Sequence, residues 1–243
     1  MYYILCYVPQ SEPDSPRRLL SASRSSVVFV FAMPKSLSPF LVTPIPLRAV
    51  VVLGRYGVST MLTLREAAER DFAAIARLHA ESWRSAYRGM LSDEYLDHRV
   101  HLERTTLWQQ RFSERAEKPF FVILAEVEEE LTGFGCVFPD EHPTYGAFLD
   151  NLHVVPQRTG HGIGRRLLSA IAERLLTDER RGGLYLWVIE QNARARQFYA
   201  KAGALEVECA ELSMPDGSRQ KEMRCFWPNP ARLLATHTPE PVQ

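Results

Sequence analysis

The chain has 243 residues, of which 46% are hydrophobic and 24% are charged, a composition that supports a packed core and excludes global disorder. Lys and Arg together number 29, as do Asp and Glu, so the formal net charge is zero. This balance argues against a protein whose main task is to neutralise a nucleic-acid backbone.

Residues 1–60 are dense in Ser and Pro, and the prolines interrupt each apolar run before a helical or strand period is established. The segment carries Arg and few acidic residues, which is typical of a targeting peptide, but it shows no amphipathic helix and no cleavage site. We therefore expect residues 1–60 to be a disordered or non-native extension. A patterned domain begins at Met61.

From Met61 onward the hydrophobic pattern alternates between the periods of strands and of helices. The strands are predicted at residues 62–65, 120–127, 131–138, 147–155, 184–189, 204–212 and 220–227. The helices are predicted at residues 69–87, 92–108, 162–180 and 193–202, the last with Asn192 as its N-cap. This order predicts a mixed, partly antiparallel α/β sheet in a domain at residues 61–230, followed by a flexible tail at 231–243.

Three glycines, Gly160, Gly162 and Gly164, lie between a predicted strand and a predicted helix. A helix N-terminus presents unpaired backbone N–H groups and a positive dipole, which suit an anion. Arg165 and Arg166 oppose that dipole, a placement that a bound diphosphate would make favourable. A tight turn without a ligand is the alternative. The Rossmann spacing fails because Arg165 stands where glycine is needed, and a Walker loop fails because its Gly-Lys-Ser/Thr is missing.

Four stretches carry a family resemblance, in this order along the chain: Glu81–Leu91, Leu149–Pro156, Gly160–Leu168 and Leu186–Tyr199. They resemble motifs of the GCN5-related N-acetyltransferase (GNAT) superfamily, in a bacterial type that acts on small acceptors. The resemblance covers residues 61–227. It implies an α/β fold with a mixed, mostly antiparallel sheet of about seven strands, whose central strands are splayed, flanked by about four helices.

The resemblance also implies acetyl-CoA as co-substrate, with its diphosphate on the loop amides and its pantetheine arm paired with the central strand. The thioester would lie where the two central strands splay apart, next to a bulge. The cofactor-binding residues implied are Leu152, His153, Val154, Arg158, Thr159, Gly160, His161, Gly162, Ile163, Gly164, Arg165, Asn192 and Tyr199. Thr159 departs from the family pattern, which usually has Gln or Arg there, and Arg158, Arg165 or Arg166 would compensate.

Tyr199 falls where the family often has a tyrosine near the cofactor sulfur, and its hydroxyl would protonate the departing thiolate. Core packing is its alternative role. Asp150, His153 and Glu190 are candidates for the base that deprotonates the acceptor, with Asp150 as first choice. Because neighbouring strand residues point to opposite faces, Asp150 and His153 can both face the site only if a bulge intervenes.

Glu81, Trp83 and Tyr87 lie where the family builds its acceptor wall. Aromatic rings suit a hydrophobic or cationic acceptor, and Glu81 would attract the amine. Trp83 also fits the apolar stripe of the predicted helix 69–87, so a core role is the alternative. The identity of the acceptor stays open.

We therefore expect an N-acetyltransferase that transfers acetyl directly to an amine, with a small molecule favoured over a protein N-terminus. The alternative is a non-catalytic acyl-CoA-binding or sensing module with the same fold. No metal, nucleic acid or membrane partner is implied, and a homodimer is left open. The four cysteines form no CxxC pair, and no apolar run is long enough to span a bilayer, so a cytoplasmic location is expected.

Overall fold

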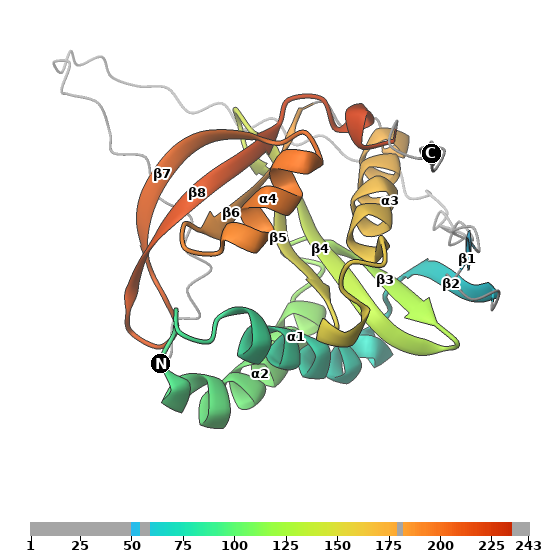
Figure 1. The fold of residues 1–243 in the computed structure, drawn as a ribbon. Coiled ribbons are helices and arrows are strands. Elements are labelled where there is room, and N and C mark those ends of the chain that lie inside the picture. Colours follow the sequence, from blue (N-terminus) through green and yellow to red (C-terminus); the bar gives the residue numbers. More distant parts are fainter. Residues whose placement is uncertain (1–49, 54–58, 179–181, 235–243) are drawn as a thin grey trace, which may run out of the picture. The chain divides into compact units, whose positions relative to one another are not determined.

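An eight-stranded sheet forms the centre of the computed structural model, which describes residues 50–53, 59–178 and 182–234 (Figure 1). The strand order is β1-β2-β3-β4-β5-β6-β8-β7, and only β5 and β6 pair in parallel. The strands are β1 (Val50–Leu53), β2 (Ser59–Glu66), β3 (Phe121–Val127), β4 (Glu130–His142), β5 (Gly146–Val154), β6 (Leu184–Ile189), β7 (Leu205–Ser213) and β8 (Arg219–Trp227). The predicted mixed, mostly antiparallel sheet is confirmed, and β1 adds a strand to the seven expected.

The four α-helices of the described residues cover the sheet in two pairs (Figure 1). One face carries α1 (Phe72–Ala86) and α2 (Val100–Ser113), and the other carries α3 (Ile163–Thr177) and α4 (Ala193–Lys201). A π-helical turn at Tyr95–Arg99 runs directly into α2. We call the two sides of the sheet the α1–α2 face and the α3 face.

The central strands are buried on both faces, and strand alternation assigns their side chains to two separate cores. In β3, Ile123 and Ala125 pack into the core beneath α3, together with Leu167 and Ile171. Val122 and Leu124, which alternate with them along the strand, pack against α1 and α2. Burial on both sides explains why this stretch reads in the sequence as a nearly continuous apolar run.

Two glycines bring the start of β5 against the start of β6. The Ala147 backbone N–H donates to the Gly183 carbonyl at 3.0 Å. Gly146 has a φ of 79°, and a Cβ atom at this position would lie 2.5 Å from the Gly183 oxygen and 2.8 Å from its nitrogen. Any side chain here would meet backbone that cannot move without separating the strands.

Gly146→Ala is therefore expected to lower the free energy of unfolding by about 3 kcal/mol, because left-handed strain and a backbone clash add together. Urea denaturation would measure the change. Gly217→Ala is the matched control: Gly217 has a φ of 86° but nothing within 4 Å of its added Cβ. The control should lose only about 1 kcal/mol. Equal losses in the two variants would show that the contact with Gly183 does not matter.

The ordered fold continues beyond both boundaries predicted from the sequence. Most of the extension expected at residues 1–60 lies outside the described residues, but β1 falls within it and pairs with β2. At the other end, Pro230–Leu233 form a 3-10 turn, and Leu233 is buried in the core beneath α3. The remaining tail residues, 235–243, lie outside the described part. Among the described residues, no helix has the length and apolar character needed to cross a membrane.

Candidate functional site

Strands β5 and β6 diverge after a short stretch of pairing. Ala147 pairs with Leu184 and Phe148 with Tyr185, and no further β5–β6 pair forms in the described residues. On its other side β5 stays paired with β4, with a register shift where Asp150 is the extra residue. The predicted splay and bulge are confirmed. The edge of β5 that faces the opening therefore offers backbone groups to an extended ligand.

A loop with two left-handed glycines connects β5 to α3. Gly160 has a φ of 84° and Gly162 a φ of 80°, and Gly162 is the residue from which the helix starts. The backbone N–H groups from Gly160 to Arg165 have no acceptor among the described residues, and the first return bond of α3 runs from Arg166 to the Gly162 carbonyl at 3.1 Å. A row of unpaired donors at a helix N-terminus suits a diphosphate.

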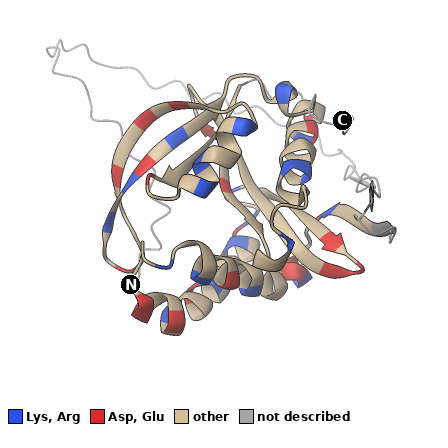
Figure 2. Ribbon diagram, in the orientation of Figure 1, with Lys and Arg blue, Asp and Glu red and all other residues tan. Residues whose placement is uncertain are grey.

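Basic side chains lie beside this loop, and Figure 2 shows Lys and Arg along both α3 and α4. Arg158, Arg165 and Arg166 form no ion pair with any acidic residue that the structure describes; Arg165 donates instead to the Lys201 carbonyl, at 3.4 Å. The Thr159 hydroxyl donates to the Pro156 carbonyl at 2.8 Å, so it is turned back into the loop. Anion contacts at this site would come from the backbone and the arginines.

Tyr199 is buried on α4, the helix that follows β6. Asn192 caps this helix as predicted, because its side-chain oxygen accepts from the Ala195 N–H at 3.1 Å. Tyr199 is 9% exposed and packs edge-on against Trp227, with ring centroids 6.0 Å apart. Its hydroxyl donates to no described residue. Burial raises the pKa of Tyr199 well above its usual value, so the phenol keeps its proton at neutral pH.

A second phenol lies on the other face of the sheet from Tyr199. Tyr87 ends α1, on the opposite face of the sheet from α4. The Tyr87 phenol nevertheless contributes, after burial, to the raised pKa of Tyr199. Tyr87 thus lies within electrostatic reach of Tyr199.

The bulge in β5 turns two neighbouring residues to the α1–α2 face. The Arg111 guanidinium, on α2, donates to the Asp150 carboxylate at 2.6 Å and to the Asn151 side-chain oxygen at 3.2 Å. His153 faces the same side, with its Nδ1 atom 2.9 Å from the Ser82 hydroxyl. Asp150 and His153 thus share a face, as they could only with a bulge.

His153 belongs to a buried polar pair beneath α1 and α2. Its ring centroid lies 4.6 Å from that of His79, whose Nδ1 accepts from the Trp108 indole at 3.1 Å. Burial lowers the pKa of His153 to about 4 and that of His79 below its usual range, so both are neutral at physiological pH. The low pKa disfavours His153 as a base.

The residues predicted to form the acceptor wall lie on α1 and at its C-terminal end. Trp83 and Tyr87 meet edge-on with ring centroids 5.1 Å apart, and Trp83 is 8% exposed within an apolar cluster, which agrees with its alternative core role. The Arg104 guanidinium lies 4.5 Å from the Trp83 ring centre, a neighbour that sequence reasoning missed. Glu81 is exposed on α1, two residues before Trp83.

Comparison with known proteins agrees with this arrangement. Residues 73–204 match the acetyltransferase (GNAT) family. The uncharacterized N-acetyltransferase YuaI of Bacillus subtilis is 30% identical over 175 residues, which cover 71% of this chain and 96% of that protein. This chain belongs to the GNAT family. A probable N-acetyltransferase of Mycobacterium tuberculosis is also 30% identical, over 58% of this chain and 78% of its own length.

Solved structures share the GNAT fold. The PaiA N-acetyltransferase of Thermoplasma acidophilum, in complex with coenzyme A, aligns with a TM-score of 0.52 and 18% identity over 68% of this chain and 99% of its own. YncA of Salmonella typhimurium, a putative acetyltransferase with acetyl-CoA, aligns with a TM-score of 0.51 and 17% identity over 75% of this chain and 99% of its own.

One carboxylate of this GNAT domain was missed by sequence reasoning. Glu222 lies on β8, is 9% exposed and forms no hydrogen bond or ion pair with a described residue. Burial raises the pKa of Glu222 to about 7. By contrast, the predicted Glu190 is exposed just beyond β6. Strand alternation over 219–227 was the available signal, because it sets Glu222 opposite the apolar Met223 and Cys225.

Proposed function

We propose that this GNAT protein is an acetyl-CoA-dependent N-acetyltransferase that transfers acetyl directly to a small-molecule amine. The observation that carries the proposal is the row of unpaired backbone N–H groups from Gly160 to Arg165, set between the open edge of β5 and α3. Family membership supports it, as does the coenzyme bound in the similar PaiA and YncA structures.

The chain's own groups fit the cofactor along its length. The diphosphate would rest on the loop N–H groups, with Arg158 and Arg165 beside it. The pantetheine arm would pair with the free edge of β5 at Leu152–Val154. The oxygen of Asn192 is already used as the helix cap, so only its amide nitrogen would reach the cofactor.

Acetyl transfer needs a proton donor for the sulfur and a proton acceptor for the amine. Tyr199 would protonate the departing thiolate, since its raised pKa keeps the phenol protonated. A backbone N–H of β5 would stabilise the tetrahedral oxyanion. Of the predicted bases, Asp150 lies on the α1–α2 face but is ion-paired with Arg111 at 2.6 Å, and Glu190 is exposed beyond β6. Each would need a rearrangement or a bridging water to act.

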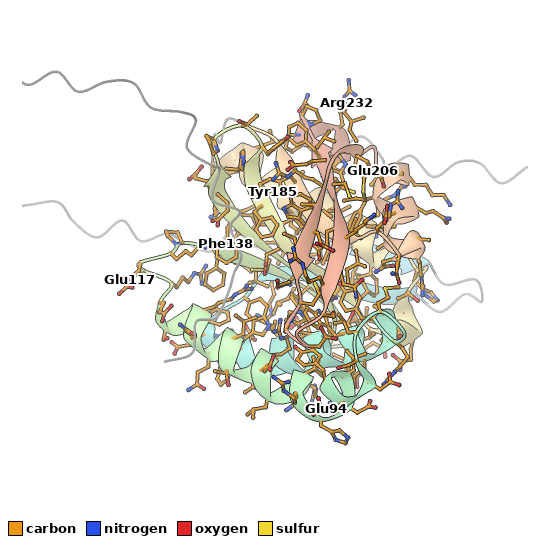
Figure 3. The ribbon with its side chains drawn as sticks, turned by 90° about the vertical axis from the view of Figure 1, so that its left-hand side faces the viewer. Glu94, Glu117, Phe138, Tyr185, Glu206 and Arg232 are labelled. Atoms are coloured by element: carbon orange, nitrogen blue, oxygen red, sulfur yellow. The ribbon has the colours of Figure 1, made fainter. Side chains whose placement is uncertain are left out.

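The β7–β8 hairpin supports a small acceptor over a protein N-terminus. The Gln220 side chain donates to the Met90 carbonyl at 2.7 Å, and the Ser92 N–H donates to the Asp216 carboxylate at 2.7 Å. In Figure 3 the hairpin descends to the helical layer that carries Glu94. These bonds hold the hairpin against the α1–α2 corner, where an extended peptide would otherwise leave the site.

Thermal unfolding of the full chain with and without acetyl-CoA tests the cofactor assignment. A ligand that binds only the folded state stabilises it by about 2.7 kcal/mol at a hundredfold excess over its Kd. Acetyl-CoA and CoA should both raise Tm, whereas acetyl-pantetheine, which lacks the diphosphate, should raise it much less. No shift with saturating acetyl-CoA or CoA would overturn the proposal.

A non-catalytic acyl-CoA-binding module is the second candidate. The observation that favours it is the hydrogen bond of the Thr159 hydroxyl within the loop. This hydroxyl would have to break that bond before it could contact a phosphate. Such a module would show the same thermal protection. It would release no thiol when amines are added, whereas the enzyme would.

A further inference from the structure

Strand β8 presents three polar side chains to the α1–α2 face, because Met223 and Cys225, which alternate with two of them, pack toward α3. Gln220 donates to the Met90 carbonyl, and Arg224 forms an ion pair with Glu208 at 2.9 Å. Glu222, between them, has no partner in the described part of the chain, although only 9% of it is exposed.

A buried carboxylate without a partner is unfavourable, since desolvation of the charge is not offset by an ion pair or a hydrogen bond. The residues paired with Glu222 across the sheet are Ile189 on β6 and Ala210 on β7, and neither carries a charge. This environment raises the pKa of Glu222 to about 7. A cation bound from outside would supply the missing partner.

The groups around Glu222 belong to the acceptor side of the proposed site. Burial raises the pKa of Tyr87, at the C-terminal end of α1, and the charge of Glu222 adds to that effect. Arg104 of α2 lowers the pKa of Tyr87, and Asp150 of β5 raises it. Tyr87 contributes in turn to the raised pKa of Tyr199. Gln220, two residues before Glu222 on the same face of β8, is bonded to the Met90 carbonyl, three residues after Tyr87. The strand therefore holds Glu222 on the side of the sheet where α1 ends.

We propose that Glu222 is the catalytic base of this enzyme: its carboxylate receives the ammonium group of the acceptor and takes a proton from it. The assignment rests on the proposed acetyltransferase function. Glu222 is a better candidate than Asp150, which is ion-paired with Arg111, and than Glu190, which is exposed. It also defines the acceptor as an amine that is protonated in solution and binds as a cation against Trp83 and Tyr87.

The step balances without a further reactant. Glu222 removes one proton from the ammonium, and the nitrogen lone pair forms a C–N bond with the thioester carbonyl carbon. The C–S bond then breaks, the thiolate leaves with the electron pair and Tyr199 protonates it. The nitrogen loses its second proton to solvent, which restores the Tyr199 proton, and Glu222 releases its own proton to water. The products are the amide, CoA thiol and one proton.

Glu222→Gln in the full chain tests the role, since it keeps the side-chain shape and removes the basic oxygen. We expect kcat to fall about 100-fold or more, with the Kd of acetyl-CoA changed less than about threefold. Glu211→Gln on β7 is the matched control: this exposed carboxylate pairs with Arg219, and its loss should leave kcat unchanged. A Glu222→Gln variant with wild-type turnover would overturn the inference and leave the proposed function standing.

The pH profile separates a base from a structural carboxylate. In the wild type kcat/KM should rise through about pH 7, near the pKa of Glu222. The midpoint should stay in place when the acceptor is exchanged for an amine of different pKa, and Glu222→Gln should lack it. A midpoint that follows the acceptor would assign the ionisation to the amine and contradict the inference.

A measurement without turnover completes the test. A carboxyl whose folded pKa is raised from 4.5 to about 7 makes the protein less stable as pH rises through that window. Between about pH 4 and about pH 8 the equilibrium constant for unfolding of the wild type should therefore increase about 200-fold relative to that of Glu222→Gln. Parallel pH profiles would contradict a buried, unpaired Glu222. A wild type that binds acetyl-CoA but acetylates no amine would instead overturn the proposed function.

Discussion

Tyr199→Phe is expected to lower kcat about 100-fold while the Kd of acetyl-CoA changes less than about threefold. The hydroxyl has no partner in the described part of the chain, so its removal breaks no bond of the resting protein. What is lost is the proton that the departing sulfur needs. Steady-state kinetics with thiol detection measures kcat, and titration calorimetry measures Kd.

Tyr95→Phe is the control for removing a hydroxyl from a buried tyrosine. The Tyr95 hydroxyl donates to Glu103 at 2.9 Å, within the α1–α2 corner, and burial also raises the pKa of Tyr95. This variant should lose some stability and retain its turnover. Wild-type kcat in Tyr199→Phe would leave Tyr199 with only its packing role against Trp227.

Gly162→Val is expected to weaken acetyl-CoA binding about 100-fold, because it would displace the loop donors. A β-branched residue rarely adopts the positive φ of this position, which is 80°. Loss of about two charge-assisted hydrogen bonds, at about 1.5 kcal/mol each, gives a change of this size. Calorimetric titration of the folded variant with acetyl-CoA measures it.

Gly203→Val is the matched control for the backbone strain. Gly203 has a φ of 85° and, like Gly162, nothing within 4 Å of an added Cβ. It follows α4 and contributes nothing to the loop between β5 and α3. The control should lose similar stability and keep its affinity for acetyl-CoA. Equal affinities in both variants would show that the loop does not hold the cofactor.

Features set by local sequence were predictable. The glycine loop before α3, the Asn192 cap and the apolar runs of β3 and β6 each depend on residues close together in the chain. Such features follow from helix capping, positive φ and periodicity alone. The order of elements followed from these local signals. The divergence of β5 from β6 was predicted from the family resemblance.

Features set by contacts between distant segments were not predictable. Asp150 was the first choice as base because the sequence near it gives no sign of its ion pair with Arg111, which lies 39 residues away. Glu222 was missed because its burial depends on the register of β8 with β6 and on the hairpin bonds to the α1–α2 corner. The burial of Trp83 beside an exposed Glu81 also depends on packing, since a two-residue offset turns the two side chains to different sides of the helix.

Amine-dependent release of CoA thiol from acetyl-CoA, with the acetylated amine identified by mass spectrometry, tests the acetyltransferase assignment most directly. The panel should contain small amines of differing charge and ring content together with peptides that carry free N-termini. We predict one CoA thiol for each acetylated amine, with small cationic amines turned over in preference to peptides. Thermal protection by acetyl-CoA without thiol release for any amine would contradict the assignment and identify a binding module.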